Sequence, residues 1–199
     1  MKKRIYIFPL ILLILFASCE SILEVEPTQA ISAEQAITNK NGLQRAVIGS
    51  YDAWQQGGYY GHNYPIFNDL IADNLRATGT KVEYAEINNN AILADNGFVE
   101  GIWNSIYRSI NRVNNVLDNI NDISDITQEE RDNYEGQMKF LRALHYFNLV
   151  RFYGGVPLRL TASTSESSSL NMPRASVNDV YQQIISDLTD AQGKITNTN

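Results

Sequence analysis

Residues 135–158 read EGQMKFLRALHYFNLVRFYGGVPL and contain the strongest structural signals of the chain. Its second half, from Phe140 to Val150, is apolar on almost every side of a helix, which predicts a helix buried in the middle of a domain. The Gly-Gly-Val-Pro sequence at 154–157 follows, and glycine past the end with proline beyond it is typical of a helix stop. The stretch therefore predicts a buried helix that ends near Tyr153.

A second long helix is expected just before this one. Its apolar residues recur at steps of three and four positions, a clean amphipathic period. They are Ile102, Ile106, Ile110, Val113, Leu117 and Ile120. Thr127 with Glu130 forms a capping box, so the following helix should begin at Gln128. Helices at 102–121 and 128–153, joined by a short connection, predict an antiparallel hairpin.

The rest of the chain is expected to add shorter helices and long loops. Capping boxes or apolar periodicity predict further helices at 33–38, at 43–55, at 67–72 and from Val177 onward. Turn-forming and polar residues predict loops at 57–65, 77–96 and 161–169. Few segments have strand character, and fragments such as Ala143-x-x-x-Phe147 match the tetratricopeptide pattern. The predicted fold class is therefore all-α, with tetratricopeptide-like helical hairpins and long irregular loops over residues 32–199.

The N-terminus has the composition of a bacterial export signal. Lys2, Lys3 and Arg4 precede an apolar run at 5–16, which is shorter than the ~20 residues of a membrane-spanning helix. Ala17-Ser18 then leads to Cys19, the only cysteine, in an order that resembles the lipobox of bacterial lipoproteins. We expect residues 1–18 to be a lipoprotein signal peptide, Cys19 to carry the lipid and residues 19–31 to be an acidic tether. The alternative is an ordinary secreted protein with a stray cysteine.

Removal of the signal changes the charge balance. Three of the 16 Lys and Arg residues and none of the 22 Asp and Glu residues lie within 1–18, which leaves 13 basic residues against 22 acidic ones and a net charge of −9. Nucleic acid and anionic membrane surfaces attract positive charge, so both are disfavoured as direct partners. With Cys19 lipidated, no thiol remains for a disulfide or a zinc site. We therefore expect no metal and no cofactor.

Several segments, taken in order, resemble the SusD/RagB-like outer-membrane nutrient-binding lipoproteins. The most specific is 135–158, which is similar to the family block GEAkFLRAlyYFdLVrlyGgVPL. Residues 103–117, WNSIYRSINRVNNVL, are similar to the family's W-Y-I-N-x-V/I-L helix, and residues 173–191 are similar to the block that follows. Leu23-Glu24 and Pro27 after Cys19 are similar to the family's start. The resemblance covers essentially the whole chain.

The resemblance implies a cell-surface, non-catalytic protein that captures oligosaccharides or peptides for uptake. Such a protein acts as a lid on a SusC-like TonB-dependent transporter, and its lipid anchor holds it on the outer membrane. Family members run to several hundred residues, so the chain is expected to be the N-terminal portion, truncated relative to the family. The resemblance carries over scaffold residues and does not define the ligand.

The window 57–98 is the one most suited to ligand contact, because it combines aromatic, amide and charged side chains. Flat rings stack on the apolar faces of sugars, and amides or carboxylates bond sugar hydroxyls. The candidate residues are Tyr59, Tyr60, His62, Asn63, Tyr64, Asp73, Asn74 and Arg76. A packing role is open as well, in which the tyrosines hold the loop onto the helices and Arg76 pairs with Asp73. Trp54 and Trp103 lie on helical stripes and are expected in the core.

An enzyme is the next hypothesis, and no sequence motif supports it. His62 and His145 are the only histidines, and the chain contains no H-E-x-x-H, no G-x-S-x-G and no glycine-rich phosphate loop. We expect His145, which lies in the apolar helix, to be a hydrogen-bonded core residue. A glycosidase-like carboxylate pair stays open because nothing selects one pair among 22 acidic residues. A structural surface lipoprotein without a ligand is the remaining alternative.

Overall fold

The computed structural model describes residues 36–163 and 172–195, all of which belong to one unit, residues 33–199. The described residues contain the six α-helices α3–α8 and one 3-10 helix, and they form no strand. The helices are α3 (Lys40–Trp54), α4 (Asn63–Ile71), α5 (Val82–Asn88), α6 (Gly97–Asn119), η1 (Ile120–Asp122), α7 (Gln128–Tyr153) and α8 (Val177–Lys194). The predicted all-α fold class is therefore confirmed.

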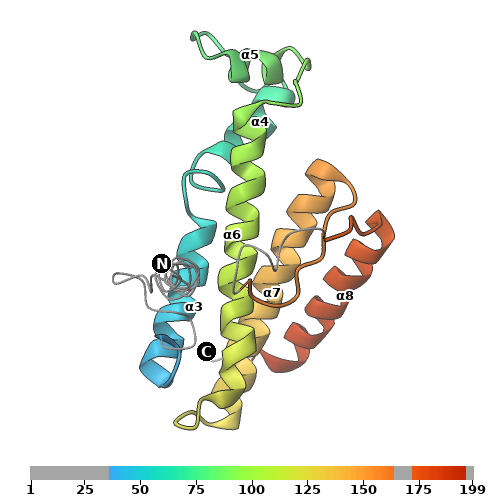
Figure 1. Cartoon of the computed structure of the whole chain (residues 1–199). Coiled ribbons are helices and arrows are strands. Elements are labelled where there is room, and N and C mark those ends of the chain that lie inside the picture. The colour runs from blue at the N-terminus through green and yellow to red at the C-terminus, as the bar shows by residue number, and fades with distance from the viewer. Residues whose placement is uncertain (1–35, 164–171, 196–199) are drawn as a thin grey trace, which may run out of the picture. The chain divides into compact units, whose positions relative to one another are not determined.

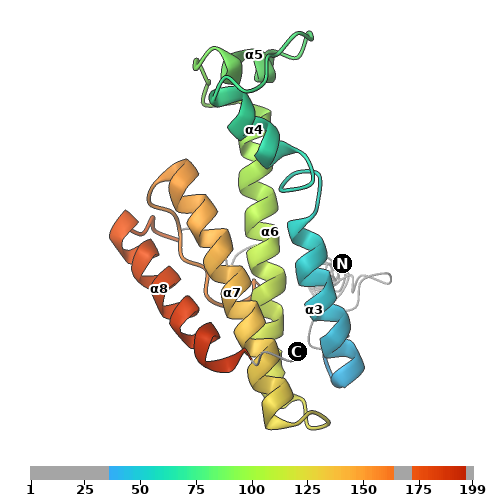
Figure 2. The ribbon, with the colours of Figure 1, turned by 180° about the vertical axis from the view of Figure 1, so that it is seen from behind.

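Four helices form the body of this unit. Helices α3, α6, α7 and α8 lie side by side in that order, and neighbouring helices contact each other along their lengths (Figure 1). Helix α7 runs antiparallel to α6, and α8 runs antiparallel to α7, as the reverse view in Figure 2 also shows. The predicted hairpin of two long helices is the pair α6 and α7. The two short helices α4 and α5 lie at the N-terminal end of α6.

Side-chain caps fix where the long helices begin. Thr127 Oγ1 accepts a hydrogen bond from the Glu130 amide at 3.2 Å, and the Glu130 carboxylate accepts one from the Thr127 amide at 3.0 Å. This is the capping box predicted for α7. Ser176 and Asp179 form the second predicted capping box, at the start of α8. Helix α6 begins five residues before the predicted start at Ile102, because Asn96 Oδ1 accepts hydrogen bonds from the first amides of the helix.

Three sequence predictions about the shorter segments are wrong. The segment 77–96 is not irregular throughout, because it contains α5, which has only seven residues and so shows no apolar period. Helix α4 begins at Asn63, four residues before the predicted start, with Pro65 accommodated in its first turn. Residues 40–42, which lie between the helices predicted at 33–38 and 43–55, are the first turn of α3, capped by Asn39. The helix start predicted at Ala33 lies outside the described residues.

Two clusters of buried apolar residues form the core, and α6 contributes to both. Ile102, Ile106 and Ile110 lie in the cluster shared with α4, α5 and the second half of α7. Further along the same helix, Val113 and Val116 lie in the cluster shared with α3 and the first half of α7. All five side chains are fully buried. Most of the predicted stripe of α6 therefore lies at the centre of the core, although Leu117 is half-buried and Val116, which the stripe did not include, is buried. Trp54 and Trp103 are half-buried and pack against the clusters.

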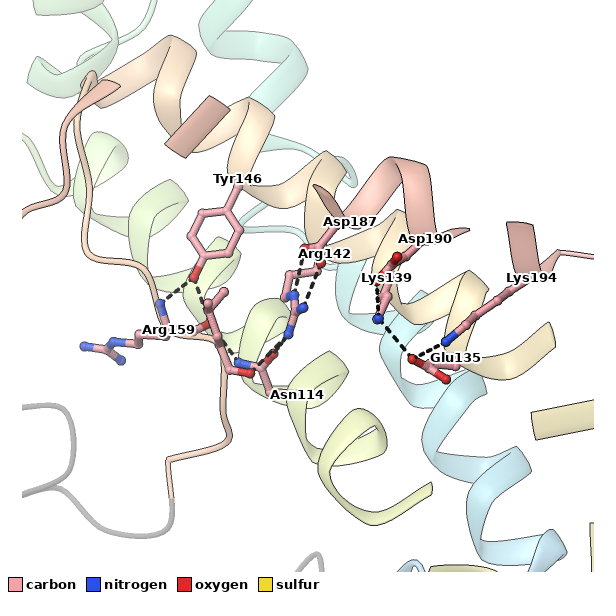
Figure 3. Close-up of polar contacts among 10 residues, drawn as sticks. Asn114, Glu135, Lys139, Arg142, Tyr146, Arg159, Asp187, Asp190 and Lys194 are labelled. Atoms are coloured by element: carbon pink, nitrogen blue, oxygen red, sulfur yellow. Dashed lines mark hydrogen bonds and ion pairs between the residues drawn. The ribbon is translucent and has the colours of Figure 1, made fainter. Parts of the chain in front are cut away.

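Charged side chains join α8 to α7 (Figure 3). Arg142 of α7 donates from Nε and Nη2 to the two carboxylate oxygens of Asp187 of α8, both at 2.8 Å, and both residues are buried. Arg142 Nη1 also donates to Asn114 Oδ1 of α6 at 3.0 Å. Nearer the end of α8, Lys139 contacts Glu135 and Asp190, and Glu135 also contacts Lys194. We call these contacts, from Arg142 to Lys194, the α7–α8 seam.

The structure explains why glycine occupies two positions, one within α7 and one directly after it. Gly154 ends the helix at φ 72°, a left-handed conformation that favours glycine, so the helix stops at the predicted residue. At Gly136 an added Cβ would lie 2.9 Å from Ile195 Cγ1 and 3.0 Å from Lys194 Cβ. Glycine therefore allows the end of α8 to approach α7 closely.

The second half of α7 is not buried on every side, contrary to the sequence prediction. Leu141 and Leu149 are fully buried, whereas Phe140 is 43% exposed and Phe147 is 38% exposed. These two rings line an open apolar groove of about 260 Å³ with Ala143, Leu144 and two residues of α8, Ile184 and Leu188. Apolar composition shows which residues of a helix can be buried. It does not show which faces of the helix another element covers.

Candidate ligand-binding pocket

An open pocket of about 380 Å³ lies where α4, α5 and α6 begin. Its lining consists of His62 and Asn63 at the start of α4, Lys81, Glu83 and Tyr84 at the start of α5, and Gly97 and Phe98 at the start of α6. Small-molecule pockets in proteins usually measure roughly 300–1,000 Å³. All seven residues fall within the window 57–98, and two of them, His62 and Asn63, are among the predicted candidates.

Aromatic rings form the apolar part of the pocket. The rings of Tyr84 and Phe98 meet edge to face, with centroids 5.0 Å apart. Phe98 is 9% exposed and belongs to the core, whereas Tyr84 is half-buried. The Lys81 ammonium lies 5.4 Å from the centre of the Tyr84 ring, within cation–π distance. Phe98 is therefore fixed in the core, and Tyr84 is the more accessible of the two rings in the pocket.

A buried amide connects α5 to the start of α6. Asn96 is 4% exposed, and its Oδ1 accepts hydrogen bonds from the Phe98 and Val99 amides at 3.1 and 3.2 Å. Its Nδ2 donates to the Glu83 carbonyl at 3.2 Å and to Glu86 Oε2 at 2.7 Å. One side chain thus caps α6 and fixes the short helix that carries Glu83 and Tyr84.

The polar groups of the pocket include both signs of charge. Lys81 and Glu83 lie at the start of α5 and are exposed, and the salt bridges among the described residues include neither of them. His62 Nδ1 lies 2.9 Å from Asn63 Oδ1, so this pair forms one hydrogen-bonded unit. Within the described ranges, no three His, Cys, Asp or Glu side chains come together as metal ligands. The pocket therefore combines an aromatic wall with neutral and charged hydrogen-bonding groups.

The predicted tyrosines differ in burial. Tyr59 is fully buried and Tyr64 is 7% exposed, which favours the packing role for these two. Burial raises the pKa of both hydroxyls, so both stay protonated. Tyr60 is 36% exposed and stacks on Tyr64, with ring centroids 4.8 Å apart. None of the three lines the pocket, although they flank His62 and Asn63 along the chain.

The predicted residues beyond α4 lie apart from the pocket lining. Asp73, Asn74 and Arg76 are exposed on the segment that follows α4. Asp73 adopts φ 57°, and Asn74 Nδ2 donates to Asp69 Oδ1 at 3.4 Å. Arg76 and Asp73 form no ion pair in the described part of the chain. The structure therefore does not bring these three residues together with His62 and Asn63.

Sequence reasoning missed Lys81, Glu83, Tyr84, Gly97 and Phe98 as pocket residues. Helix α5 is too short to show an apolar period, so the sequence offered no indication that its first turn lines a pocket. A signal for the other wall was present: Asn96 is a preferred N-cap residue two positions before the apolar pair Phe98 and Val99. A start of α6 at Gly97 could have been read from it.

His145 is buried as expected, but only one of its ring nitrogens has a partner. Nδ1 lies 3.2 Å from Tyr59 Oη, whereas Nε2 is buried without a hydrogen-bond partner among the described residues. The same Tyr59 hydroxyl accepts a hydrogen bond from Asn148 Nδ2 at 2.6 Å, which leaves its own proton free to donate to the neutral His145 ring. Burial lowers the pKa of His145 to about 3, so the ring is neutral at neutral pH.

The predicted lipidation site, Cys19, lies outside the described residues, as do the signal peptide and the tether. Within 36–163 and 172–195, none of the helices combines the length and the apolar character needed to cross a bilayer.

Comparisons with known proteins agree on one family. Residues 22–199 match the family model SusD-like_3, described as starch-binding and associating with the outer membrane. A SusD-like protein of Formosa agariphila, P38, is 30% identical over 180 residues, which are 90% of this chain and 35% of that protein. A second SusD-like protein of the same organism, P2, is 29% identical over 201 residues, which cover all of this chain and 39% of that protein.

Solved structures share the fold. A SusD superfamily protein from Bacteroides vulgatus superposes with a TM-score of 0.72 at 23% identity, over 82% of this chain and 36% of that one. The chain spans about a third of the length of the relatives it matches. Because the matched residues take in most of the sequence and all of the described helices, the chain belongs to the SusD-like family.

Proposed function

We propose that the protein is a non-catalytic binding protein of the outer membrane and that it holds oligosaccharides in the pocket at the start of α4, α5 and α6. The single observation that carries the proposal is the composition of this pocket. It places the Tyr84 and Phe98 rings beside an amide, an imidazole, an ammonium and a carboxylate. Sugars present apolar C–H faces that pack on rings and hydroxyls that need such polar partners. The family description, which names starch binding, supports the same ligand class.

The charge of the pocket favours a neutral oligosaccharide over a strongly acidic one. Lys81 and Glu83 contribute opposite charges, and the chain after the signal carries a net charge of −9. An anionic polymer would meet repulsion from the rest of the surface. A peptide is the competing ligand class, and the assay below separates the two.

The membrane arm of the proposal rests on Cys19 and on the family. Lipidation of Cys19 after removal of residues 1–18 anchors the chain in the outer membrane, with residues 19–31 as the tether and the domain on the cell surface. A multiply acylated cysteine gives stable attachment, because each buried CH₂ contributes ~0.8 kcal/mol. The partner is a SusC-like TonB-dependent transporter, which imports what the pocket captures.

Calorimetric titration of the purified protein tests the ligand arm. Oligosaccharides from starch and laminarin are titrated separately, with a mixture of short peptides as the comparison. Tyr84→Ala should weaken the binding of the active sugar at least about tenfold, because the substitution removes the more accessible of the two pocket rings. Tyr181→Ala is the matched control, since Tyr181 is 37% exposed on α8 and does not line the pocket. Equal affinity of the two variants would contradict the proposed site.

The same mixtures test the absence of catalysis and the ligand class, and a second variant tests the lipid anchor. Chromatography after prolonged incubation should recover the sugars intact, and the release of shorter products would replace the binding protein with an enzyme. Binding of peptides but of no sugar would change the ligand class. Binding of neither would leave a structural surface lipoprotein. Cys19→Ala should move the protein from the membrane fraction to the soluble one, and its retention in the membrane would contradict the lipid anchor.

A further inference from the structure

One buried amide holds the segment that leads into the pocket. Residues 57–64, here called the tyrosine loop, connect α3 to the first turn of α4 and contain His62 and Asn63. Asn148 lies opposite this loop on α7 and is 1% exposed. Its Nδ2 donates to the hydroxyls of Tyr59 at 2.6 Å and Tyr60 at 3.2 Å. Its Oδ1 accepts a hydrogen bond from Tyr64 Oη at 2.8 Å.

The backbone bonds of the tyrosine loop are internal to it or reach only its immediate neighbours. Asn63 donates to the Gly57 carbonyl at 2.9 Å, Tyr64 to the Tyr59 carbonyl at 3.0 Å and Gly61 to the Gln56 carbonyl at 3.1 Å. Such bonds fix the shape of the loop but not its distance from α7. The three hydroxyl bonds to Asn148, together with the Tyr59–His145 bond, fix that distance. Stacking of Tyr64 on Phe152 of α7, with centroids 5.0 Å apart, adds apolar contact.

The loop carries the polar wall of the pocket between its anchored tyrosines. His62 and Asn63 form a hydrogen-bonded pair at 2.9 Å, and their chain neighbours on the two sides include Tyr60 and Tyr64. A shift of the loop backbone that takes the tyrosine hydroxyls away from Asn148 therefore moves both polar groups relative to Tyr84 and Phe98. Binding groups act only when neighbouring residues hold them in place.

We propose that Asn148 is a positioning residue for this pocket: from α7, it sets the place of the tyrosine loop and so of His62 and Asn63. The inference rests on the proposed function for its consequence in ligand affinity. Its structural half, the placement of the loop, stands on the hydrogen bonds alone. The two halves therefore need separate measurements.

Amide hydrogen exchange on the full chain tests the structural half without a ligand. Asn148→Ala should increase the exchange rate of amides in residues 57–64 about tenfold or more, because it removes three hydrogen bonds at once. Asn114→Ala is the matched control. Asn114 is also fully buried, but it bonds Arg142 and the carbonyls of Arg159 and Thr161, away from the tyrosine loop (Figure 3). If both variants left exchange at 57–64 equally slow, the proposal would be wrong.

Calorimetry with the oligosaccharide that binds the unmodified protein tests the functional half. Asn148→Ala should weaken binding about tenfold, while Asn114→Ala should change affinity less than about twofold at comparable loss of stability. Asn148→Gln should restore part of the affinity, because its amide keeps both a donor for Tyr59 and Tyr60 and an acceptor for Tyr64. If no sugar binds the unmodified protein, the proposed function fails while the exchange result still decides the placement. If a sugar binds equally well to all three variants, the positioning role is refuted while the proposed function stands.

Discussion

The α7–α8 seam and the wall of the pocket are held together by very different contacts. At the seam, two long helices share a buried bidentate ion pair, Arg142–Asp187, and a second group of charges around Glu135. At the pocket, the seven-residue α5 is attached through the buried Ile87, through the Tyr84 ring on Phe98 and through the amide bonds of Asn96. Separating the buried charge pair at the seam is therefore costly, whereas the proposed ligand wall depends on a few individually weaker contacts. The expected loss of stability accordingly decreases from the seam to the pocket wall.

The largest effect is expected at the seam. Arg142→Ala leaves the carboxylate of Asp187, which is 2% exposed, buried without its partner. Removing one member of a buried pair typically costs about 3–5 kcal/mol, so the free energy of unfolding in urea should fall by about that amount. The double variant Arg142→Met with Asp187→Leu tests the cause, because two apolar residues leave no buried charge. If the double variant were as unstable as Arg142→Ala, loss of packing rather than an unpaired charge would explain the effect.

A smaller and more local effect is expected at the pocket wall. Asn96→Ala removes the cap of α6 and the bonds to Glu83 and Glu86, so unfolding should cost about 1–2 kcal/mol less. Hydrogen exchange of the amides in α5 should become faster, because the helix loses its connection to α6.

Asn39→Ala is the matched control for this prediction, since Asn39 caps α3 through the Gly42 amide at 3.0 Å. It should cost about 1 kcal/mol without changing exchange in α5. Equal exchange of α5 in the two variants would show that Asn96 does not anchor the helix.

The smallest effect is the pH dependence of the seam. Burial alone would raise the pKa of Glu135, but the hydrogen bonds from Lys194 and Lys139 outweigh it and hold this pKa below the ordinary value of 4.5. The hydrogen bond from Lys139 likewise lowers the pKa of Asp190 below 3.8. A carboxyl group whose pKa is lowered by folding stabilises the fold above its unfolded pKa, and this contribution is lost as the pH falls through the folded pKa.

Stability should therefore decline below about pH 4.5, by no more than about 1 kcal/mol from Glu135, because the site is close to solvent. Unfolding free energies measured between pH 6 and pH 3 check this, with Glu135→Gln as the variant. The difference in stability between the two proteins should shrink as the pH falls. A constant difference across that range would remove Glu135 from the pH response.

The long helices could be predicted from sequence because their signals are local. The period of Ile102, Ile106 and Ile110 and the capping box of Thr127 and Glu130 each lie within a few turns of one helix, and both describe the structure. The order of those helices followed from the short connection between them. The exposure of Phe140 could not be predicted, because it depends on whether another element covers that face.

The pocket was only partly predictable for a related reason. His62 and Asn63 stand in a segment rich in aromatic and amide residues, which marks a candidate binding region. Lys81 and Tyr84 join them only because α5 folds back beside α6, and that placement depends on the side chain of Asn96. Tyr59 is a candidate ligand contact in the sequence, but its side chain is fully buried and its hydroxyl is hydrogen-bonded to Asn148.

Helix α6 passes through both buried clusters, and this has a thermodynamic consequence. With 23 residues at ~1.5 Å each, it is a continuous element of ~35 Å. Unfolding of the helix in one cluster would therefore expose apolar residues of the other cluster. The two halves of the domain should consequently melt in one cooperative transition. A ligand held against Phe98, at one end of that helix, then raises the melting temperature of the far end as much as that of its own surroundings.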